Sequence, residues 1–296
     1  MRRPKTLAVI GVGLIGGSAA LALRRAGIAT RVVGFDRDRA ALEKAAALGV
    51  IDTAADSTRE AVKDADFVLV AVPVRSVGPV LHDAAPALRS EAVVTDVGST
   101  KAEVVAIARE ELRERFPRFV PGHPIAGRET SGVESALQDL FRGARVVLTP
   151  EKETAPDAIE AVRSAWEAAG ARVSTASALD HDRVFAAVSH LPHILSFALV
   201  SELIARDNAA ELLGFAAGGF RDFTRIAASS PQMWRDIALQ NRDALLAEID
   251  RYGARLAVFR ELIERGEAAG LERLMTEART ARANWAAGAK RPVSNE

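Results

Sequence analysis

The stretch LAVIGVGLIGGSAALALRRAG, residues 7–27, joins a short apolar strand to an alanine-rich helix through a glycine turn. Its glycines fit the pattern G-x-G-x-x-G. Gly11 suits the tight turn, Gly13 lets the backbone approach a pyrophosphate, and Gly16 lets the helix pack closely on the strand. These glycines also argue against a signal peptide or a membrane span, although no charged residue interrupts Leu7–Leu23. We therefore predict a dinucleotide-binding turn, with the helix N-terminus facing the phosphates.

An acidic residue follows the glycine turn at the expected distance. Asp36 lies 20 residues after Gly16, at the end of the predicted strand Arg31–Phe35. Its carboxylate can accept hydrogen bonds from ribose hydroxyls and would repel a 2′-phosphate, so we expect NAD as the cofactor. The neighbouring Arg37 is the residue that could admit NADP instead. The expected cofactor-binding residues are Gly11, Gly13, Leu14, Ile15, Gly16, Asp36, Arg37, Val72, Pro73 and Ser99.

Short apolar runs and helical stretches alternate over the first 175 residues or so. This is the pattern of βαβ units, so we predict an α/β fold: a Rossmann-type, doubly wound, parallel sheet with helices on both faces. The predicted strands are Leu7–Ile10, Arg31–Phe35, Phe67–Val72, Ala92–Thr95, Phe119–Pro121, Arg145–Leu148 and Ala171–Ser174. The predicted helices are Leu14–Ala26, Asp38–Leu48, Val77–Leu88 and Lys101–Arg115. We expect Ser99-Thr100 and Glu103 to cap the last of these helices.

The strand pattern disappears from about Leu179 onward, where apolar residues recur at spacings of three and four. We therefore predict two domains: an NAD-binding Rossmann domain over residues 1–175 and an all-helical, substrate-binding domain over residues 176–296. A helical half with several amphipathic helices and no sheet to cover often dimerises, so we expect a homodimer through this domain.

The composition excludes several classes of protein. The 296 residues include 39 Lys and Arg against 39 Asp and Glu, so the formal net charge is zero. No basic field points to nucleic acid or to an anionic membrane, and we expect neither as a partner. The chain has no cysteine, which excludes a thiolate nucleophile, an iron–sulfur cluster and Cys-ligated zinc. Any chemistry must come from His, Ser, Asp, Glu or Arg side chains, or from a cofactor.

Two polar segments follow predicted strands, at the sheet edge where ligands bind in open α/β folds. They are Asp96–Lys101 after the fourth strand and Gly122–Glu129 after the fifth. The second contains His123, held between Gly122 and Pro124, and a neutral imidazole can accept a proton at about pH 7. A histidine with only a structural hydrogen bond is the simpler alternative, but the position at the cofactor edge favours catalysis.

Together with segments further along the chain, these motifs resemble the prephenate/arogenate dehydrogenase family. Its members are NAD(P)-dependent enzymes of tyrosine biosynthesis with a Rossmann domain and a helical dimerisation domain. The resemblance spans nearly the whole chain. The matching segments are the glycine motif, Asp96–Lys101, His123–Gly127 with Glu129 and Ser131-Gly132, His181-Asp182 with Ser189–His193, and Gly219–Arg225. Arg128 departs from the family pattern, where a smaller residue such as Thr is expected, and this bears on substrate access or preference.

The resemblance implies a cytoplasmic enzyme that catalyses oxidative decarboxylation of prephenate. Arogenate, or both substrates, is the alternative. In this reaction hydride passes to NAD while His123 accepts the proton of the 4-hydroxyl. The resemblance also implies that Ser99 orients His123 and the nicotinamide, although a plain helix cap is compatible with the same position. Tyrosine is a possible active-site inhibitor, with His193 as its contact.

A dianionic substrate needs cations, and guanidinium groups bind carboxylates in a bidentate manner. We assign Arg225 to carboxylate recognition, with Arg221 one helical turn earlier. The resemblance adds an ionic gate formed by Glu129 and Asp222 with Arg225, and a contact between His193 and the substrate side chain. It gives His181 a weaker binding or structural part. The expected substrate-binding residues are Arg225, His193, Glu129, Arg221, Asp222, His181 and Trp234.

Alternatives remain for several of these residues. An aromatic residue such as Trp234 at helical spacing is usually core, and His190 is also expected in the core. A metal site formed by His190 and His193 lacks a carboxylate at a convincing spacing, so we expect no metal. Pro192, between these histidines, breaks a rule of helix interiors, which suggests a functional site.

Two other functions are compatible with a Rossmann domain followed by helices. A 3-hydroxyacid dehydrogenase or imine reductase is the nearest enzymatic alternative, but 3-hydroxyacid enzymes use a lysine in the helical domain. The only lysine after Lys152 here is Lys290, in the C-terminal tail. A non-catalytic nucleotide sensor is disfavoured by the presence of Ser99, His123 and Arg225.

Overall fold

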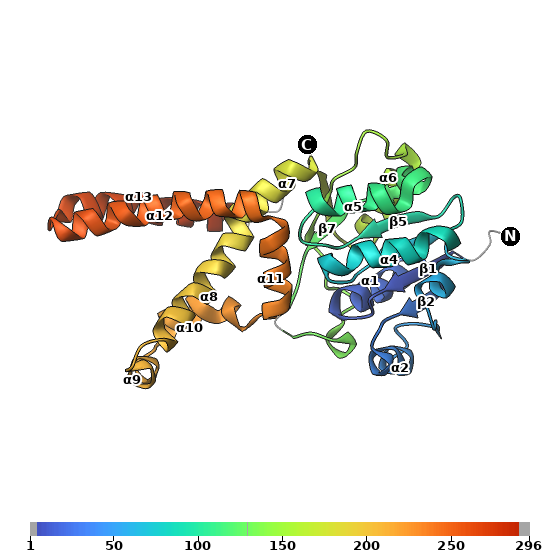
Figure 1. Cartoon of the computed structure of the whole chain (residues 1–296), viewed down its shortest axis with the longest axis horizontal. Coiled ribbons are helices and arrows are strands. Elements are labelled where there is room, and N and C mark those ends of the chain that lie inside the picture. Colours follow the sequence, from blue (N-terminus) through green and yellow to red (C-terminus); the bar gives the residue numbers. More distant parts are fainter. Residues whose placement is uncertain (1–4, 129, 290–296) are drawn as a thin grey trace. The chain divides into compact units, whose positions relative to one another are not determined.

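The computed structural model describes residues 5–128 and 130–289. The chain divides into two compact units, Met1–Leu245 and Leu246–Glu296. Figure 1 labels most of the helices and some of the strands. The first unit contains both sheets and the helices up to α11, and α12 runs from the first unit into the second.

A six-stranded parallel sheet forms the centre of the first unit, with the strand order β3-β2-β1-β4-β5-β6. Its strands are β1 (Thr6–Ile10), β2 (Arg31–Phe35), β3 (Thr53–Ala54), β4 (Phe67–Val70), β5 (Val93–Asp96) and β6 (Phe119–Val120). The order reverses between β1 and β4, so the carboxyl ends of these two strands border the crevice in which ligands bind in such folds. The predicted doubly wound parallel sheet is confirmed. The short strand β3 was not predicted from the sequence.

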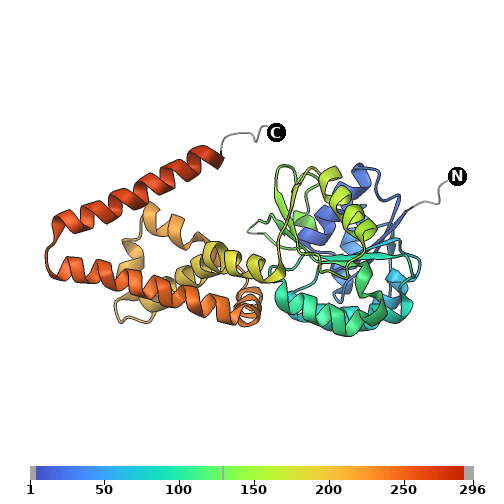
Figure 2. The same ribbon diagram turned by 90° about the horizontal axis from the view of Figure 1, so that it is seen from above.

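Helices cover both faces of this sheet because side chains along each strand point alternately to opposite faces. Leu7 and Val9 pack with α1 (Leu14–Arg25), α2 (Arg39–Ala47) and α6 (Pro156–Ala168). Ala8 and Ile10 pack on the other face, with α3 (Thr58–Val62), α4 (Val77–Ala84) and α5 (Ala102–Leu112). Figure 2 shows α4 and α5 on one side of the sheet and α1 and α6 on the other. Helices α3 and α6 were not predicted.

The remaining strands form a second sheet, which corrects the prediction of a single one. Strand β7 (Gly122–Ile125) pairs antiparallel with β8 (Arg145–Leu148), which pairs parallel with β9 (Arg172–Thr175). Pro121 separates β6 from β7, and proline cannot donate to a strand ladder, so the first sheet ends there. His123 therefore lies in a strand and not in the loop that the sequence suggested.

The chain after β9 is helical, as predicted. Helix α7 (Ala178–Phe185) continues through a π-helical turn, η5 (Ala186–His190), into α8 (Leu191–Ile204). Pro192 lies in the first turn of α8, where its missing N–H is tolerated because the π turn interrupts the regular hydrogen bonding before it. The following elements are α9 (Ala209–Gly214), α10 (Gly218–Thr224), η6 (Arg225–Ala228), α11 (Pro231–Gln240), α12 (Arg242–Glu264) and α13 (Ala268–Ala289).

One helical segment among the described residues, Ala178–Ile204, is long and apolar enough by length and composition to cross a membrane. It carries the buried polar side chains of His181, Asp182 and His190, which have hydrogen-bond partners inside the first unit. A single helix of this kind is weak evidence for a membrane span, because core helices of soluble proteins pass the same test.

The second unit contains most of α12 together with α13. Figure 2 shows the two helices diverging from the turn that joins them, where Gly266 has a φ of +66°. None of the residues 246–287 is buried. Large apolar side chains such as Leu256, Ile263 and Trp285 are exposed. This hairpin has no core of its own.

Candidate active site

The glycine turn between β1 and α1 has the geometry that a bound dinucleotide needs. Gly11 has a φ of +93°, and a Cβ there would lie 2.4 Å from the carbonyl oxygen of Ala71. A Cβ on Gly16 would lie 2.0 Å from the carbonyl oxygen of Gly11, so only glycine fits. A Cβ on Gly13 would meet nothing within 4 Å. The open space beside Gly13, at the N-terminus of α1, suits a pyrophosphate.

Asp36 lies at the end of β2 and holds the glycine turn in place. Its Oδ2 accepts a hydrogen bond from the backbone N–H of Val12 at 2.9 Å, and its Oδ1 accepts one from the N–H of Asp38 at 3.0 Å. The side chain is only partly buried, and Arg37 beside it is exposed. Val72 and Pro73 directly follow β4, the strand next to β1. These residues fit the predicted dinucleotide, since they combine a helix N-terminus with a ribose-binding carboxylate.

A cavity of about 900 Å³ within the first unit connects the glycine turn to the helical part of the chain. It brings together most of the residues that the sequence singled out. The predicted residues that line it are Leu14, Ile15, Ser99, His123, His193, Arg225 and Trp234. Arg128 lines it as well. Arg221, Asp222 and His181 are not among the lining residues, and Glu129 lies outside the residues that the structure describes.

His123 lies in β7, opposite Val147 of β8, and its ring reaches the cavity. Its Nδ1 is 2.8 Å from Nε2 of His181, whose Nδ1 is 2.8 Å from Oδ1 of Asp182. Among the described residues, His181 is the one hydrogen-bond partner of this ring, so Ser99 lines the same cavity without bonding to it. Burial lowers the pKa of His123 well below 6.5, and the nearby His181 and Lys101 lower it further. The imidazole is therefore neutral and can act as a base.

A buried ion pair holds the residue before His123. The side chains of Asp96 and Lys101 are fully buried and form a hydrogen-bonded ion pair. Oδ1 of Asp96 accepts a hydrogen bond from the N–H of Gly122 at 3.0 Å, and Nζ of Lys101 donates one to the carbonyl oxygen of Gly122 at 2.8 Å. The sequence marked the segment that contains this pair but not its function. The signal in the sequence that could have revealed this function is the pair of opposite charges, Asp96 and Lys101, five residues apart and directly after a predicted strand.

The N-terminus of α5 is capped differently from the prediction. The backbone N–H groups of Lys101 and Ala102 each donate to the carboxylate of Asp182 at 2.8 Å. The hydroxyl of Thr100 instead donates to Oε1 of Gln240 at 2.6 Å. The predicted capping by Ser99-Thr100 and Glu103 is therefore wrong, because a carboxylate from α7 occupies the position of the cap. Asp182 thereby fixes α7, which also carries His181, against α5.

His193, which also lines the cavity, is stacked on Trp234, with ring centroids 3.5 Å apart and an interplanar angle of 18°. Its Nδ1 lies 2.9 Å from the carbonyl oxygen of Ser189, so this nitrogen carries the proton. Burial lowers the pKa of His193, and the charge of Arg225 lowers it further, which keeps the ring neutral. Trp234 is only 7% exposed, and its ring packs against that of His193.

His190 is buried away from the cavity, as expected for a core residue. Its Nδ1 lies 3.0 Å from Nδ2 of Asn241, which can only donate. Burial lowers the pKa of His190 to about 4, so the ring is neutral. No group of three or more potential metal ligands occurs in the described part of the chain.

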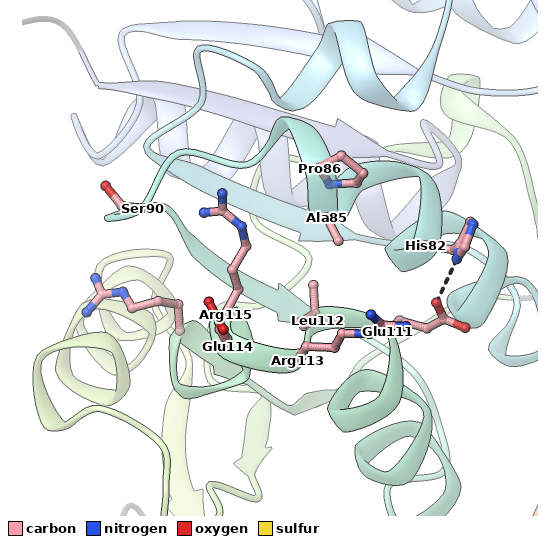
Figure 3. A pocket seen from close by; sticks show the side chains of 10 residues that line it. His82, Ala85, Pro86, Ser90, Glu111, Leu112, Arg113, Glu114 and Arg115 are labelled. Carbon is pink, nitrogen blue, oxygen red and sulfur yellow. Dashed lines mark hydrogen bonds and ion pairs between the residues drawn. The ribbon is translucent and has the colours of Figure 1, made fainter.

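A second hollow, of about 830 Å³, lies on the opposite edge of the sheet (Figure 3). It opens between the end of α4 and the end of α5, beside residues that precede β5 and β6. Arg115 points toward Pro86 across it, and His82 contacts Glu111 at 2.9 Å. Because ligands in this type of fold bind at the carboxyl ends of the strands, this hollow is not the site of the chemistry.

Comparison with known proteins agrees with the geometry of the site. Residues 19–175 match the family model of the prephenate dehydrogenase nucleotide-binding domain, and residues 177–277 match that of the prephenate dehydrogenase dimerization domain. The chain belongs to the prephenate dehydrogenase family. This confirms the family that the sequence motifs suggested, together with its nucleotide-binding and helical parts.

Individual members of the family are similar over most of their length. The cyclohexadienyl dehydrogenase of Zymomonas mobilis is 38% identical over 88% of both chains. The prephenate dehydrogenase of Bacillus subtilis is 40% identical over 93% of this chain and 74% of its own. Among solved structures, prephenate dehydrogenase from Aquifex aeolicus in complex with hydroxyphenyl propionate and NAD+ has a TM-score of 0.90 and 39% identity, covering 95% of this chain and 98% of that one. Synechocystis arogenate dehydrogenase has a TM-score of 0.80 and 30% identity, covering 95% and 99%.

Proposed function

We propose that this chain catalyses the NAD-dependent oxidative decarboxylation of prephenate to 4-hydroxyphenylpyruvate. One observation carries the proposal: the half-buried, neutral His123 lines a cavity that also contains the start of the glycine-turn helix, at Leu14 and Ile15. A base is thus placed next to a dinucleotide site. The names of the similar proteins in Bacillus subtilis and Aquifex aeolicus support the choice of substrate.

The residues suit the chemistry of this reaction. Bound NAD supplies the acceptor for hydride from the carbon that carries the 4-hydroxyl. Nε2 of His123 accepts the hydroxyl proton as the C–O bond becomes a carbonyl. When the ring carboxylate leaves as CO₂, its bonding electrons make the ring aromatic, and the proton returns to the phenol oxygen. Ser99, which lines the same cavity, orients the nicotinamide and the hydroxyl.

The charges of the cavity favour prephenate over arogenate. Among the described residues that line the cavity, Arg128 and Arg225 are the ones with a full side-chain charge, and both are cations. Two cations suit the two carboxylates of prephenate, because guanidinium binds carboxylate in a bidentate manner. Arogenate carries an ammonium group in place of the side-chain keto group, and Arg128 would repel it. Arg225, which lines the cavity, selects the acidic substrate, and the parts assigned to Arg221, Asp222 and Glu129 stay predictions from the family resemblance.

We further propose that the enzyme is a cytoplasmic homodimer in which residues 1–175 bind NAD and residues 176–296 bind substrate and dimerise. The similarity of residues 177–277 to a dimerization domain supports this assembly, as does the lack of buried side chains among residues 246–287. Tyrosine, which shares the phenol ring and the side-chain carboxylate of the products, inhibits in the active site through His193 and Trp234.

The test is steady-state reduction of NAD and of NADP by the purified protein with each substrate. We expect the highest kcat/KM with prephenate and NAD. In Arg128→Thr, the preference for prephenate over arogenate falls by about tenfold, the effect of one charged contact. Arg142→Thr, at an arginine outside the cavity lining, is the matched control and leaves the preference unchanged. Higher kcat/KM with arogenate in the wild type would show that arogenate is the preferred substrate of the same mechanism. No turnover with either substrate would refute the proposal.

A further inference from the structure

Behind the proposed base lies a row of three hydrogen-bonded side chains that ends at a carboxylate. His123 contacts His181 at 2.8 Å, and His181 contacts Asp182 at 2.8 Å. His181 is 1% exposed and Asp182 is 5% exposed. His181 does not line the cavity, so it has no surface to offer a substrate.

The hydrogen bonds of Asp182 determine where the protons of this row lie. Its carboxylate oxygens accept from the backbone N–H groups of Lys101 and Ala102, so the carboxylate acts as an acceptor throughout. Nδ1 of His181 must then carry the proton that points at Asp182. A neutral His181 has no second proton, which leaves Nε2 as an acceptor. Nδ1 of His123 must donate to that nitrogen, and Nε2 of His123 keeps its lone pair.

Hydrogen bonds from the backbone also fix the carboxylate of Asp182, so it remains the acceptor of the proton on Nδ1 of His181. The N–H of Lys101 and the N–H of Ala102 fix its two oxygens, and Nδ2 of Asn241 donates to its backbone carbonyl at 2.8 Å. The carboxylate thus stays where the N-terminus of α5 places it. The same carboxylate of Asp182 therefore caps α5 and, through His181, orients the base His123.

We propose that Asp182 and His181 are positioning residues that hold His123 as its Nδ1–H tautomer, so that Nε2 faces the cavity as the proton acceptor. This assignment rests on the proposed function, and it gives His181 a positioning role in place of a substrate-binding role. It predicts that changes at these residues reduce kcat, because fewer molecules present a competent base. KM and the affinity for NAD change little, because neither residue reaches the cavity.

The direct test is ¹⁵N NMR of the histidine rings in the full-length protein, at about pH 8, where the rings are neutral. The chain has five histidines, so assignment through single variants is practical. We expect both His123 and His181 to be protonated at Nδ1 and unprotonated at Nε2. In Asp182→Asn, an amide that donates to Nδ1 of His181 reverses both rings. A wild-type spectrum with either ring protonated at Nε2 would overturn the proposal.

Kinetics provide the second readout. We expect kcat of Asp182→Asn to fall by about 10²- to 10⁴-fold, the contribution of a positioned general base, with KM within about threefold. Asp180→Asn, at an exposed carboxylate on the same helix, is the matched control and keeps wild-type kcat. Because Asp182→Asn also weakens the cap of α5, His181→Gln and His181→Leu form a second pair.

Glutamine keeps an oxygen that can accept from Nδ1 of His123, whereas leucine does not. We therefore expect His181→Gln to retain at least about tenfold more kcat than His181→Leu, at equal KM. A raised KM with unchanged kcat in both variants would show that His181 binds substrate, against the proposal. The NMR result does not depend on turnover, so a protein that fails to oxidise prephenate still reports its tautomers.

Discussion

Replacing Lys101 with methionine tests whether the buried ion pair stabilises the fold and tunes the base. The variant leaves the carboxylate of Asp96 buried without its cation, and breaking one side of a buried pair costs about 3–5 kcal/mol. Asp96 retains two backbone donors, the N–H groups of Gly98 at 2.7 Å and of Gly122 at 3.0 Å. We therefore expect the lower end of the range, about 3 kcal/mol, or a loss of roughly 150-fold in the folding equilibrium constant.

Urea unfolding followed by tryptophan fluorescence, at matched protein concentrations, measures this loss. The double variant Asp96→Asn/Lys101→Met removes the unpaired charge, so we expect it to be more stable than Lys101→Met alone. Burial lowers the pKa of His123, and the charge of Lys101 contributes to that lowering. The acid limb of kcat/KM therefore moves to higher pH in Lys101→Met. A loss below about 1 kcal/mol together with an unmoved acid limb would refute this reasoning.

Three other predictions follow from the geometry. Gly13→Ala leaves the free energy of unfolding within about 0.5 kcal/mol of wild type but weakens NAD binding at least tenfold, because its Cβ enters the space for the pyrophosphate; equal NAD affinity by calorimetry would contradict this. Gly16→Ala instead destabilises the fold by more than about 2 kcal/mol, because its Cβ meets Gly11, and a wild-type urea midpoint would show the contact to be harmless. Burial lowers the pKa of His190 to about 4, so the folded state resists a proton that the unfolded state binds below about pH 6.5. The free energy of unfolding should then fall as the pH drops from about 6.5 to about 4, and this slope should be shallower in His190→Gln; identical slopes would argue against the assignment.

The features that could be predicted from the sequence are those that a single βαβ unit determines. The glycine turn and the alternating strands and helices depend on residues close in sequence, and the helical second half has the period of a helix. The second sheet could not be predicted in this way, because β7 is defined by pairing with β8, where His123 lies opposite Val147. The cap of α5 by Asp182 joins residues 80 or more positions apart, which no local pattern encodes. The π turn before Pro192 was indicated only as a broken helix rule.

For the same reason, the sequence indicated which residues belong to the site but not all of their contacts. His123, Ser99, His193 and Arg225 line one cavity. The partner of His123 proved to be His181, for which the family resemblance implied a weaker binding or structural part, because the packing of α7 against α5 decides which side chain lies behind the base.

The central claim is that His123 accepts a proton during NAD-dependent oxidative decarboxylation of prephenate. The most direct measurement follows NADH, CO₂ and 4-hydroxyphenylpyruvate in a single turnover of the wild type and of His123→Asn, with saturating NAD. The account predicts one equivalent of each product in the wild type. It also predicts a rate at least about 10²-fold lower in the variant, with unchanged NAD affinity. A variant rate within tenfold of wild type, or NADH formed without CO₂, would contradict it.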